Sequence, residues 1–156
     1  MSRPGRPPRL ESVFQSYDPP LYFVTIGAFH RQRLLATESV HLVFREVAQR
    51  GFREKSIATG RYVLLPDHLH VFVSGPDSFD LRQWVRMLKT VVGKRLLQLG
   101  HKPEFWQRGF FDHLIRNSES YEKKWAYVYQ NPVRAGLAGR AEDWPYQGEI
   151  VPVVRP

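Results

Sequence analysis

A pair of apolar segments separated by a turn constrains the fold of this chain most strongly. Residues 57–65 and 68–74 are rich in β-branched, aromatic and other apolar side chains, and Pro66-Asp67 lies between them. Such a composition favours strands, and the Pro-Asp pair favours a reversal of the chain. The sequence therefore predicts two antiparallel strands paired as a hairpin.

The second strand of this hairpin carries two histidines, His68 and His70. Side chains alternate between the faces of a strand, so both imidazoles share one face. Two imidazoles on one face are either a pair of metal ligands or two ordinary surface histidines. The sequence contains no cysteine, so any metal must be held by histidine, carboxylate, amide or water, a set that favours Mg²⁺ or Mn²⁺.

The spacing of apolar residues predicts the remaining elements. They are a strand from Leu21, a helix capped by Thr37, a helix from Leu81 to about Leu99, a strand over 110–115, and a last helix capped by Asn117 or Ser118 and closed by Pro132. The chain after Ala135 is expected to be irregular. This order predicts an α+β fold of the ferredoxin-like, split βαβ kind: an antiparallel sheet with helices on one face and an extra C-terminal helix.

The length of 156 residues suits one compact domain. We expect a flexible basic arm over residues 1–19, a single domain over 20–146 and a C-terminal tail over 147–156. No apolar run approaches the roughly 20 residues of a membrane-spanning helix, and no apolar segment follows the first positive charges. We therefore expect a cytoplasmic protein with no membrane partner.

The charge of the chain suits a polyanionic partner. There are 23 Lys and Arg against 15 Asp and Glu, a formal net charge of +8, which favours nucleic acid. Between Leu81 and Arg108 the basic residues far outnumber the single acid, as in a groove that follows a phosphate backbone; a solvated helix face is the alternative. The candidate DNA contacts in this region are Arg82, Arg86, Lys89, Lys94, Arg95 and Arg108.

Aromatic and histidine side chains elsewhere give weaker signals. Phe105 and Trp106 are candidate platforms for unpaired bases or core residues, and Phe110 is expected in the core. Strand alternation separates Asp112 from His113, so they cannot both face one ion. His113 is a candidate for supporting a metal site or contacting DNA, whereas His30, His41 and His101 are expected at the surface.

The last predicted helix places one tyrosine on a polar stripe. At about 100° per residue, Tyr121, Trp125 and Val128 form the core-facing stripe. Tyr127 falls instead with the polar residues Lys123, Lys124 and Asn131. Tyr127 is therefore either an ordinary surface tyrosine or a phenolic nucleophile with the Asn131 amide one turn further on.

Three segments together resemble a known family. They are LPDHLH at 65–70, WQRGFFDHLIR at 106–116 and YVYQNPVRAGL at 127–137. In this order they are similar to the motifs of the single-tyrosine HUH transposases (IS200-like), and within them to the REP-associated tyrosine transposase branch. The resemblance covers roughly residues 21–146; Asp67 departs from the asparagine that many members have there.

The resemblance implies a metal-dependent, single-stranded DNA endonuclease and strand transferase that acts at hairpin or REP-type sequences. His68 and His70 would bind the divalent ion, Mg²⁺ or Mn²⁺, and Asn131 would complete the site, where close relatives have glutamine. Tyr127 would attack the DNA and form a 5′-phosphotyrosine bond. Lys123, Lys124 and Arg134 are further candidate DNA contacts.

Two functions of other classes stay open at this point. One is a non-catalytic module that binds single-stranded nucleic acid on a ferredoxin-like sheet. The other is a metal-dependent phosphoesterase in which a metal-bound water attacks and Tyr127 is incidental. The oligomeric state, monomer or homodimer, is open as well.

Overall fold

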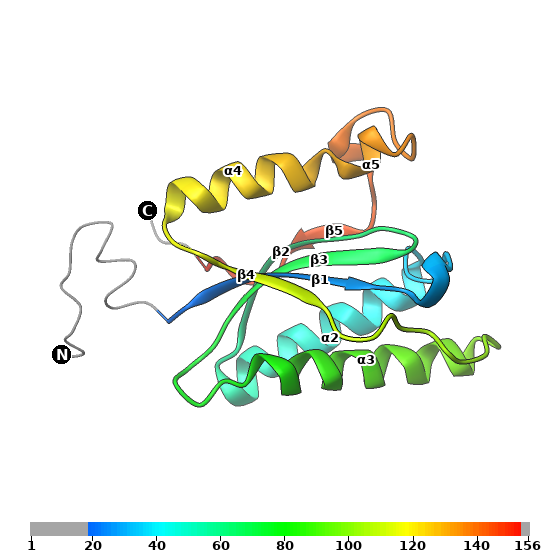
Figure 1. Ribbon diagram of the computed structural model, residues 1–156, viewed down its shortest axis with the longest axis horizontal. Coiled ribbons are helices and arrows are strands. Elements are labelled where there is room, and N and C mark those ends of the chain that lie inside the picture. The colour runs from blue at the N-terminus through cyan, green and yellow to red at the C-terminus, as the bar shows by residue number, and fades with distance from the viewer. Residues whose placement is uncertain (1–18, 154–156) are drawn as a thin grey trace.

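The centre of the molecule is a five-stranded antiparallel sheet. The computed structural model describes residues 19–153, so the expected basic arm lies outside the described residues except for residue 19. The strands lie in the order β4-β1-β3-β2-β5 (Figure 1). Their bounds are β1 Leu21–Gly27, β2 Ala58–Leu64, β3 His68–Ser74, β4 Phe111–Ile115 and β5 Gln147–Glu149.

Helices cover both faces of this sheet. Figure 1 shows α2 and α3 on one face and α4 on the other. The helices are α2 Glu38–Lys55, α3 Leu81–Gln98, α4 Ser118–Tyr129 and the short α5 Asn131–Arg134, with 3₁₀ turns η1 Phe29–Arg31 and η2 Ala141–Asp143. The α+β, ferredoxin-like expectation is confirmed, and α4 is the extra helix.

Polar side chains fix where the long helices begin. The Thr37 hydroxyl accepts a hydrogen bond from the backbone N–H of Val40 at 3.2 Å, and Asn117 accepts one from Ser120 at 2.8 Å. Each satisfies a donor that the first helical turn leaves free. Asn117, rather than Ser118, is therefore the cap of α4.

Alternation along β3 divides the core into two layers. Leu69 and Val71 are buried in the cluster that includes the apolar faces of α2 and α3. Phe72 points the other way and packs against Tyr121 of α4, with 4.6 Å between the ring centroids. The face that receives α4 is consequently the face that carries His68 and His70.

The chain beyond α4 is more ordered than the sequence predicted. The last helix ends at Tyr129, and Pro132 lies in α5 instead of closing α4. Residues 147–149, expected within a C-terminal tail, form β5 and extend the sheet beside β2. A strand this short has no periodicity to detect, and it depends on Gly148, where a Cβ would lie 2.9 Å from the Tyr62 hydroxyl oxygen.

The structure decides between the alternatives for Phe105 and Trp106 and corrects the expectation for one histidine. Phe105 is buried in the core, and Trp106 is partly buried against it, with its indole N–H donating to the Lys89 carbonyl at 3.0 Å. His41 is not a partnerless surface residue, because its Nε2 is hydrogen bonded to the Tyr62 hydroxyl at 2.7 Å.

Candidate active site

The two histidines of β3 lie side by side on the face of the sheet that α4 covers. Their ring centroids are 4.7 Å apart and the rings are nearly perpendicular. On β1, His68 is paired with Gly27 and His70 with Thr25. The prediction that both imidazoles share a face is confirmed, and Gly27 presents no side chain beside His68.

Each imidazole has its Nδ1 atom engaged by an oxygen. His68 Nδ1 lies 2.8 Å from Asp67 Oδ1, and His70 Nδ1 lies 2.9 Å from Thr25 Oγ1. Metal-binding histidines characteristically hold one ring nitrogen in this way, which fixes the tautomer and leaves the other nitrogen for the ion. The Nε2 atoms of His68 and His70 therefore fit a divalent cation.

Asp67 is itself held in place by Arg31. The Arg31 Nε donates to the second oxygen of Asp67 at 3.1 Å. Burial opposes ionisation of Asp67, but hydrogen bonds with His68 and Arg31 outweigh it and hold the pKa of the carboxyl below its usual value. Arg31 adopts φ of 56°, an uncommon conformation for a residue with a side chain, so its role was not visible in the sequence.

The environment of His70 keeps it neutral. Burial lowers the pKa of His70 to about 3, and the neighbouring charges of His68, Lys124 and Arg134 act in the same direction. A neutral imidazole is the form that binds a metal ion. Lys124 of α4 and Arg134 of α5 therefore stand close enough to the sheet to act on His70.

The tyrosines of α4 differ in access to solvent as the sequence predicted. Tyr121 is 2% exposed, and burial raises its pKa to about 12 although Arg61 opposes the change. Tyr127 is 64% exposed. Tyr127 is accordingly the tyrosine of these two that is able to meet a large substrate.

Arg134 joins the elements of the α4–α5 junction. Its guanidinium carbon lies 3.9 Å from the centroid of the Tyr127 ring, and its Nη2 donates to the Tyr127 carbonyl at 2.8 Å and to the Asn131 side-chain oxygen. Asn131 is the first residue of α5 and not a further turn of α4. The structure thus brings Tyr127, Asn131 and Arg134 together.

The two lysines of α4 have different surroundings. The Lys124 ammonium lies 5.1 Å from the centroid of the Phe23 ring, on the sheet face of the site. Lys123 pairs with Glu119 at 3.5 Å, and both side chains are largely exposed. Of the two, Lys124 is the one placed beside the histidines.

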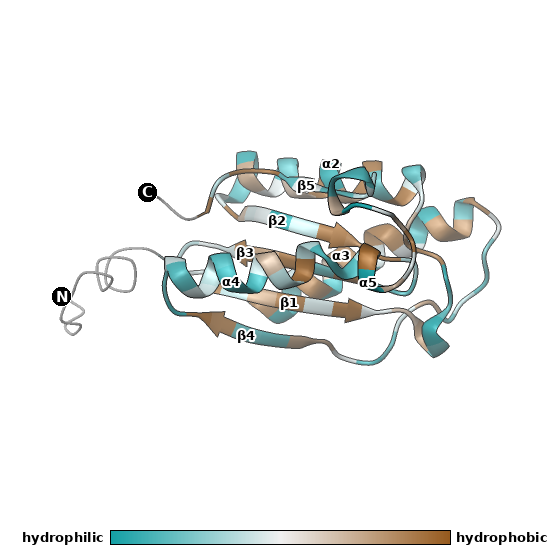
Figure 2. Ribbon diagram, turned by 90° about the horizontal axis from the view of Figure 1, so that it is seen from above, coloured by the Kyte–Doolittle hydropathy of each residue, from teal (hydrophilic) through white to brown (hydrophobic). Residues whose placement is uncertain are grey.

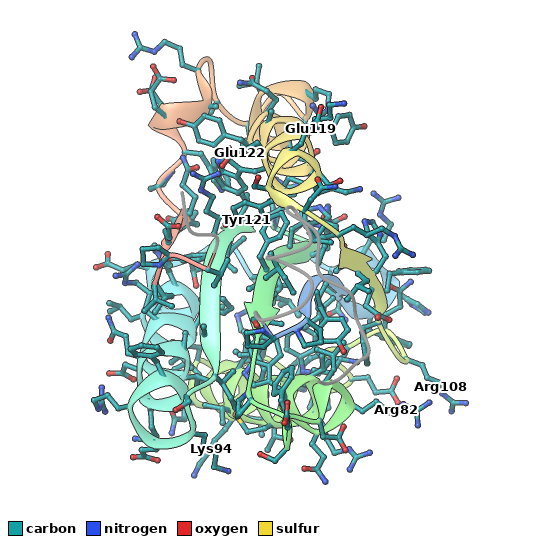
Figure 3. The ribbon with its side chains drawn as sticks, turned by 90° about the vertical axis from the view of Figure 1, so that its left-hand side faces the viewer. Arg82, Lys94, Arg108, Glu119, Tyr121 and Glu122 are labelled. Carbon is teal, nitrogen blue, oxygen red and sulfur yellow. The ribbon has the colours of Figure 1, made fainter. Side chains whose placement is uncertain are left out.

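The basic residues of α3 lie on the side of the sheet away from the histidines. Because α3 packs on the opposite face of the sheet, Arg82 and Lys94 lie far from α4 in Figure 3, and Arg108, in the loop that follows α3, lies far from α4 as well. Arg86 and Arg95 are on the same helix, and Lys89 donates its amino group to the Gln107 and Gly109 carbonyls at 3.0 and 2.8 Å. The structure does not bring the basic residues of α3 together with the histidines. The contact of these residues and of Arg108 with DNA stays a prediction.

The pairing of the strands reveals neighbours of His113 and Thr25 that the sequence alone does not show. His113 lies on β4 opposite Phe23, with 5.6 Å between the ring centroids, and burial and Lys124 lower its pKa. It therefore shares the face of His70. Thr25 was missed because it stands in an otherwise apolar strand, and only its pairing with His70 reveals its function.

Residues 19–153 contain no group of three or more histidine, aspartate or glutamate side chains arranged to hold a metal ion. An ion held by the nitrogens of His68 and His70 would take its oxygen ligands from an amide such as that of Asn131, from water or from substrate. Within the same residues, no helix is both long and apolar enough to cross a membrane.

Comparison with known sequences gives a consistent result. The family model described as Transposase IS200 like matches residues 21–131. A Haemophilus influenzae protein provisionally named REP-associated tyrosine transposase is 30% identical over 139 residues, covering 81% of this chain and 77% of that protein. A REP-associated tyrosine transposase of Escherichia coli is 29% identical over 128 residues, covering 80% and 73%.

Solved structures with a similar fold agree. The structure of a REP-associated tyrosine transposase bound to a REP hairpin has a TM-score of 0.66 and 26% identity, with 83% of this chain and 76% of that chain covered. A provisionally named transposase of Deinococcus radiodurans, at 13% identity and a TM-score of 0.51, covers 72% and 91% and shares the fold.

Proposed function

The chain belongs to the family of IS200-like transposases, and we propose that it cuts and rejoins single-stranded DNA at hairpin or REP-type sequences with Tyr127 as nucleophile. One observation carries the assignment of residues. The ammonium of Lys124, on the same helix as Tyr127, lies 5.1 Å from the centroid of the Phe23 ring, and that ring stacks on His70 with 5.3 Å between the centroids. This arrangement supports a site with two parts: a histidine pair on β3 and a tyrosine at the end of α4.

The residues that would hold the divalent ion are His68 and His70, through Nε2, and Asn131, through its side-chain oxygen. Bound there, the ion would polarise the scissile phosphate and offset the negative charge that develops on it. Asp67 and Thr25 orient the two imidazoles through their hydrogen bonds to Nδ1.

Tyr127 supplies the covalent step. A bond forms between its phenolic oxygen and phosphorus while the bond from phosphorus to the 3′ oxygen breaks. The phenolic proton passes to solvent and the departing 3′ oxygen gains a proton, so the products are a 5′-phosphotyrosine and a 3′-hydroxyl. Arg134, already in contact with the Tyr127 ring, offsets negative charge on the attacking oxygen.

The phosphotyrosine bond keeps the cleavage reaction reversible. A 3′-hydroxyl that later enters the site attacks the same phosphorus and releases Tyr127. The energy of the phosphodiester is thus retained, and the reaction is strand transfer and not hydrolysis. Hairpin DNA as the substrate is supported by the related transposase that was solved with a REP hairpin and by the net charge of +8.

The test is the formation of a covalent adduct. The protein is incubated with Mg²⁺ or Mn²⁺ and a REP hairpin that has single-stranded tails, and the products are separated on a denaturing gel. We expect an adduct with the unchanged protein and none with Tyr127→Phe, because the substitution removes only the attacking oxygen. Tyr129→Phe, on the same helix but packed against Trp125, is the matched control and should retain the adduct.

Two results would contradict this function. DNA cleavage that persists in Tyr127→Phe would indicate attack by a metal-bound water. Tight binding of the hairpin with neither cleavage nor adduct in the unchanged protein would indicate a non-catalytic binding module.

A further inference from the structure

An exposed aromatic residue lies on the edge strand β4 next to the candidate site. Phe111 is 74% exposed, the highest value among the large apolar side chains of the described residues. Figure 2 shows β4 at the margin of the sheet, beyond α4, which lies over β1 and β3. A single exposed apolar side chain is common on protein surfaces, so the neighbours of Phe111 decide whether it forms a contact surface.

The register of the sheet connects Phe111 with the histidine pair. Phe111 is paired with Thr25 of β1, and Thr25 is paired with His70 of β3. Paired residues of antiparallel strands point to the same face, so these three side chains form one row across the sheet. Two strand spacings, about 10 Å, separate the backbone of Phe111 from that of His70.

The surroundings of this row suit a nucleotide. His113, two residues along β4, points to the same face. The Lys124 ammonium lies 5.1 Å from the centroid of the Phe23 ring, and that ring is in contact with both His70 and His113, with centroids 5.3 and 5.6 Å away. An aromatic face with a nearby cation offers a surface for a base and a partner for its phosphate.

We propose that Phe111, with His113 beside it, is a stacking platform for one unpaired base of the single-stranded DNA that leads away from the scissile phosphate. This inference rests on the proposed function for the position of that phosphate. The occupant is DNA and not a second copy of the chain, because a net charge of +8 attracts a polyanion and repels another copy.

The platform is tested by binding in the Tyr127→Phe background, where no covalent step interferes. The probe is a fluorescent REP hairpin with single-stranded tails, and fluorescence anisotropy gives the Kd. Phe111→Ala should weaken binding by about 5- to 150-fold, the range expected for losing one stacked base. Phe111→Trp should keep the affinity of the parent, since it restores an aromatic face.

Leu114→Ala is the matched control. Leu114 is on the same strand and is 45% exposed, but alternation places it on the opposite face. Its substitution should leave the Kd unchanged. Thermal unfolding of each variant shows whether the fold is intact, which the exposure of Phe111 leads us to expect.

Single abasic sites placed one at a time along the tails identify the stacked base. At one position the abasic probe should bind the parent and Phe111→Ala equally, because the base that the ring contacts is absent. The proposal is overturned if the Kd of Phe111→Ala equals that of the parent. It is also overturned if Phe111→Ala weakens binding by the same factor with every abasic probe. A Phe111→Ala protein that binds DNA normally but changes from dimer to monomer overturns it as well, and would make β4 an interface between copies.

The outcome is separable from that of the proposed function. If the protein with Tyr127 forms no adduct while the loss in Phe111→Ala persists at one base, the nucleophile assignment fails and the platform stands. If the adduct forms and Phe111→Ala binds normally, the platform alone fails.

Discussion

At the scale of single residues, the histidine pair depends on the oxygens that hold it. His70 is hydrogen bonded to Thr25 across two strands, and His68 to its neighbour Asp67. The second contact is visible in the sequence as an adjacent Asp-His pair. The first requires the register of β1 against β3, which local composition does not determine, and this is why Thr25 was not predicted.

Thr25→Val is expected to weaken divalent metal binding by about 10- to 100-fold, the usual effect of removing a hydrogen bond that orients a metal ligand. The change keeps the shape of the side chain and removes its oxygen, so the His70 ring loses its fixed tautomer. Titration calorimetry with Mn²⁺ measures the effect.

Thr90→Val is the control for Thr25→Val, since the Thr90 hydroxyl donates to the Arg86 carbonyl within α3 and is remote from the histidines. Equal Mn²⁺ affinity in the Thr25→Val protein and the unchanged protein would show that Thr25 does not support a metal ligand.

At the scale of elements, the sequence was sufficient to predict those helices that have a capping residue and a periodic apolar face. Thr37 and Asn117 begin α2 and α4 as expected, and Tyr127 lies on the exposed stripe of α4. Elements that depend on distant pairing were not predictable. β5 exists because Gly148 allows the chain to approach Tyr62. The position of Asn131 follows from the break between α4 and α5, and helical spacing from Tyr127 does not predict it.

The α4–α5 junction is expected to be sensitive to Arg134. Arg134→Ala removes the cation over the Tyr127 ring and the donor to Asn131, so the rate of adduct formation should fall by at least about tenfold. Arg134→Lys keeps the charge but not the planar, multiple donors, and should recover part of the rate. Gel-based time courses of adduct formation measure both.

Arg140→Ala serves as the control for the junction, because Arg140 pairs with Glu142 and Asp143 at the surface. A normal rate in Arg134→Ala would mean that the guanidinium contacts Tyr127 without aiding its reaction.

At the scale of the whole molecule, the sheet separates the basic residues of α3 on one face from Lys124 and Arg134 on the other. The net charge indicated a nucleic-acid partner, but it did not indicate which face of the sheet would carry the site. Lys94 and Arg95 line a groove with Arg50 between α2 and α3, on the face opposite His68 and His70. The sequence shows that basic residues cluster along α3. Only the packing of α3 shows which face of the sheet they lie on.

The stability of the whole fold is expected to depend on pH through the histidines with lowered pKa values, His70, His113 and His41, and His41 is the one of these three that lies away from the candidate site. Burial and the nearby Arg45 charge lower the pKa of His41 below 6.5. As the pH falls below about 6.5, the unfolded chain takes up a proton that the folded protein resists, so folding stability decreases. His41→Gln, which does not titrate, should lose less stability between about pH 7 and pH 5.

Urea unfolding at a series of pH values measures the effect of His41. The His101→Gln variant, changed at an exposed histidine, is the reference and should follow the unchanged protein. Parallel curves for His41→Gln and the unchanged protein would show that His41 does not contribute to the pH dependence.

The separation of Tyr127 from the histidine pair has a further consequence for the handling of DNA ends. Tyr127 belongs to a helix that lies on the sheet through Tyr121 and Val128, whereas His68 and His70 belong to a central strand. In the proposed reaction, cleavage would leave the 5′ end tethered to Tyr127 in the helical layer and the 3′ end free beside the sheet. The protein would therefore retain one DNA end while the other is exchanged, until a new 3′-hydroxyl releases Tyr127.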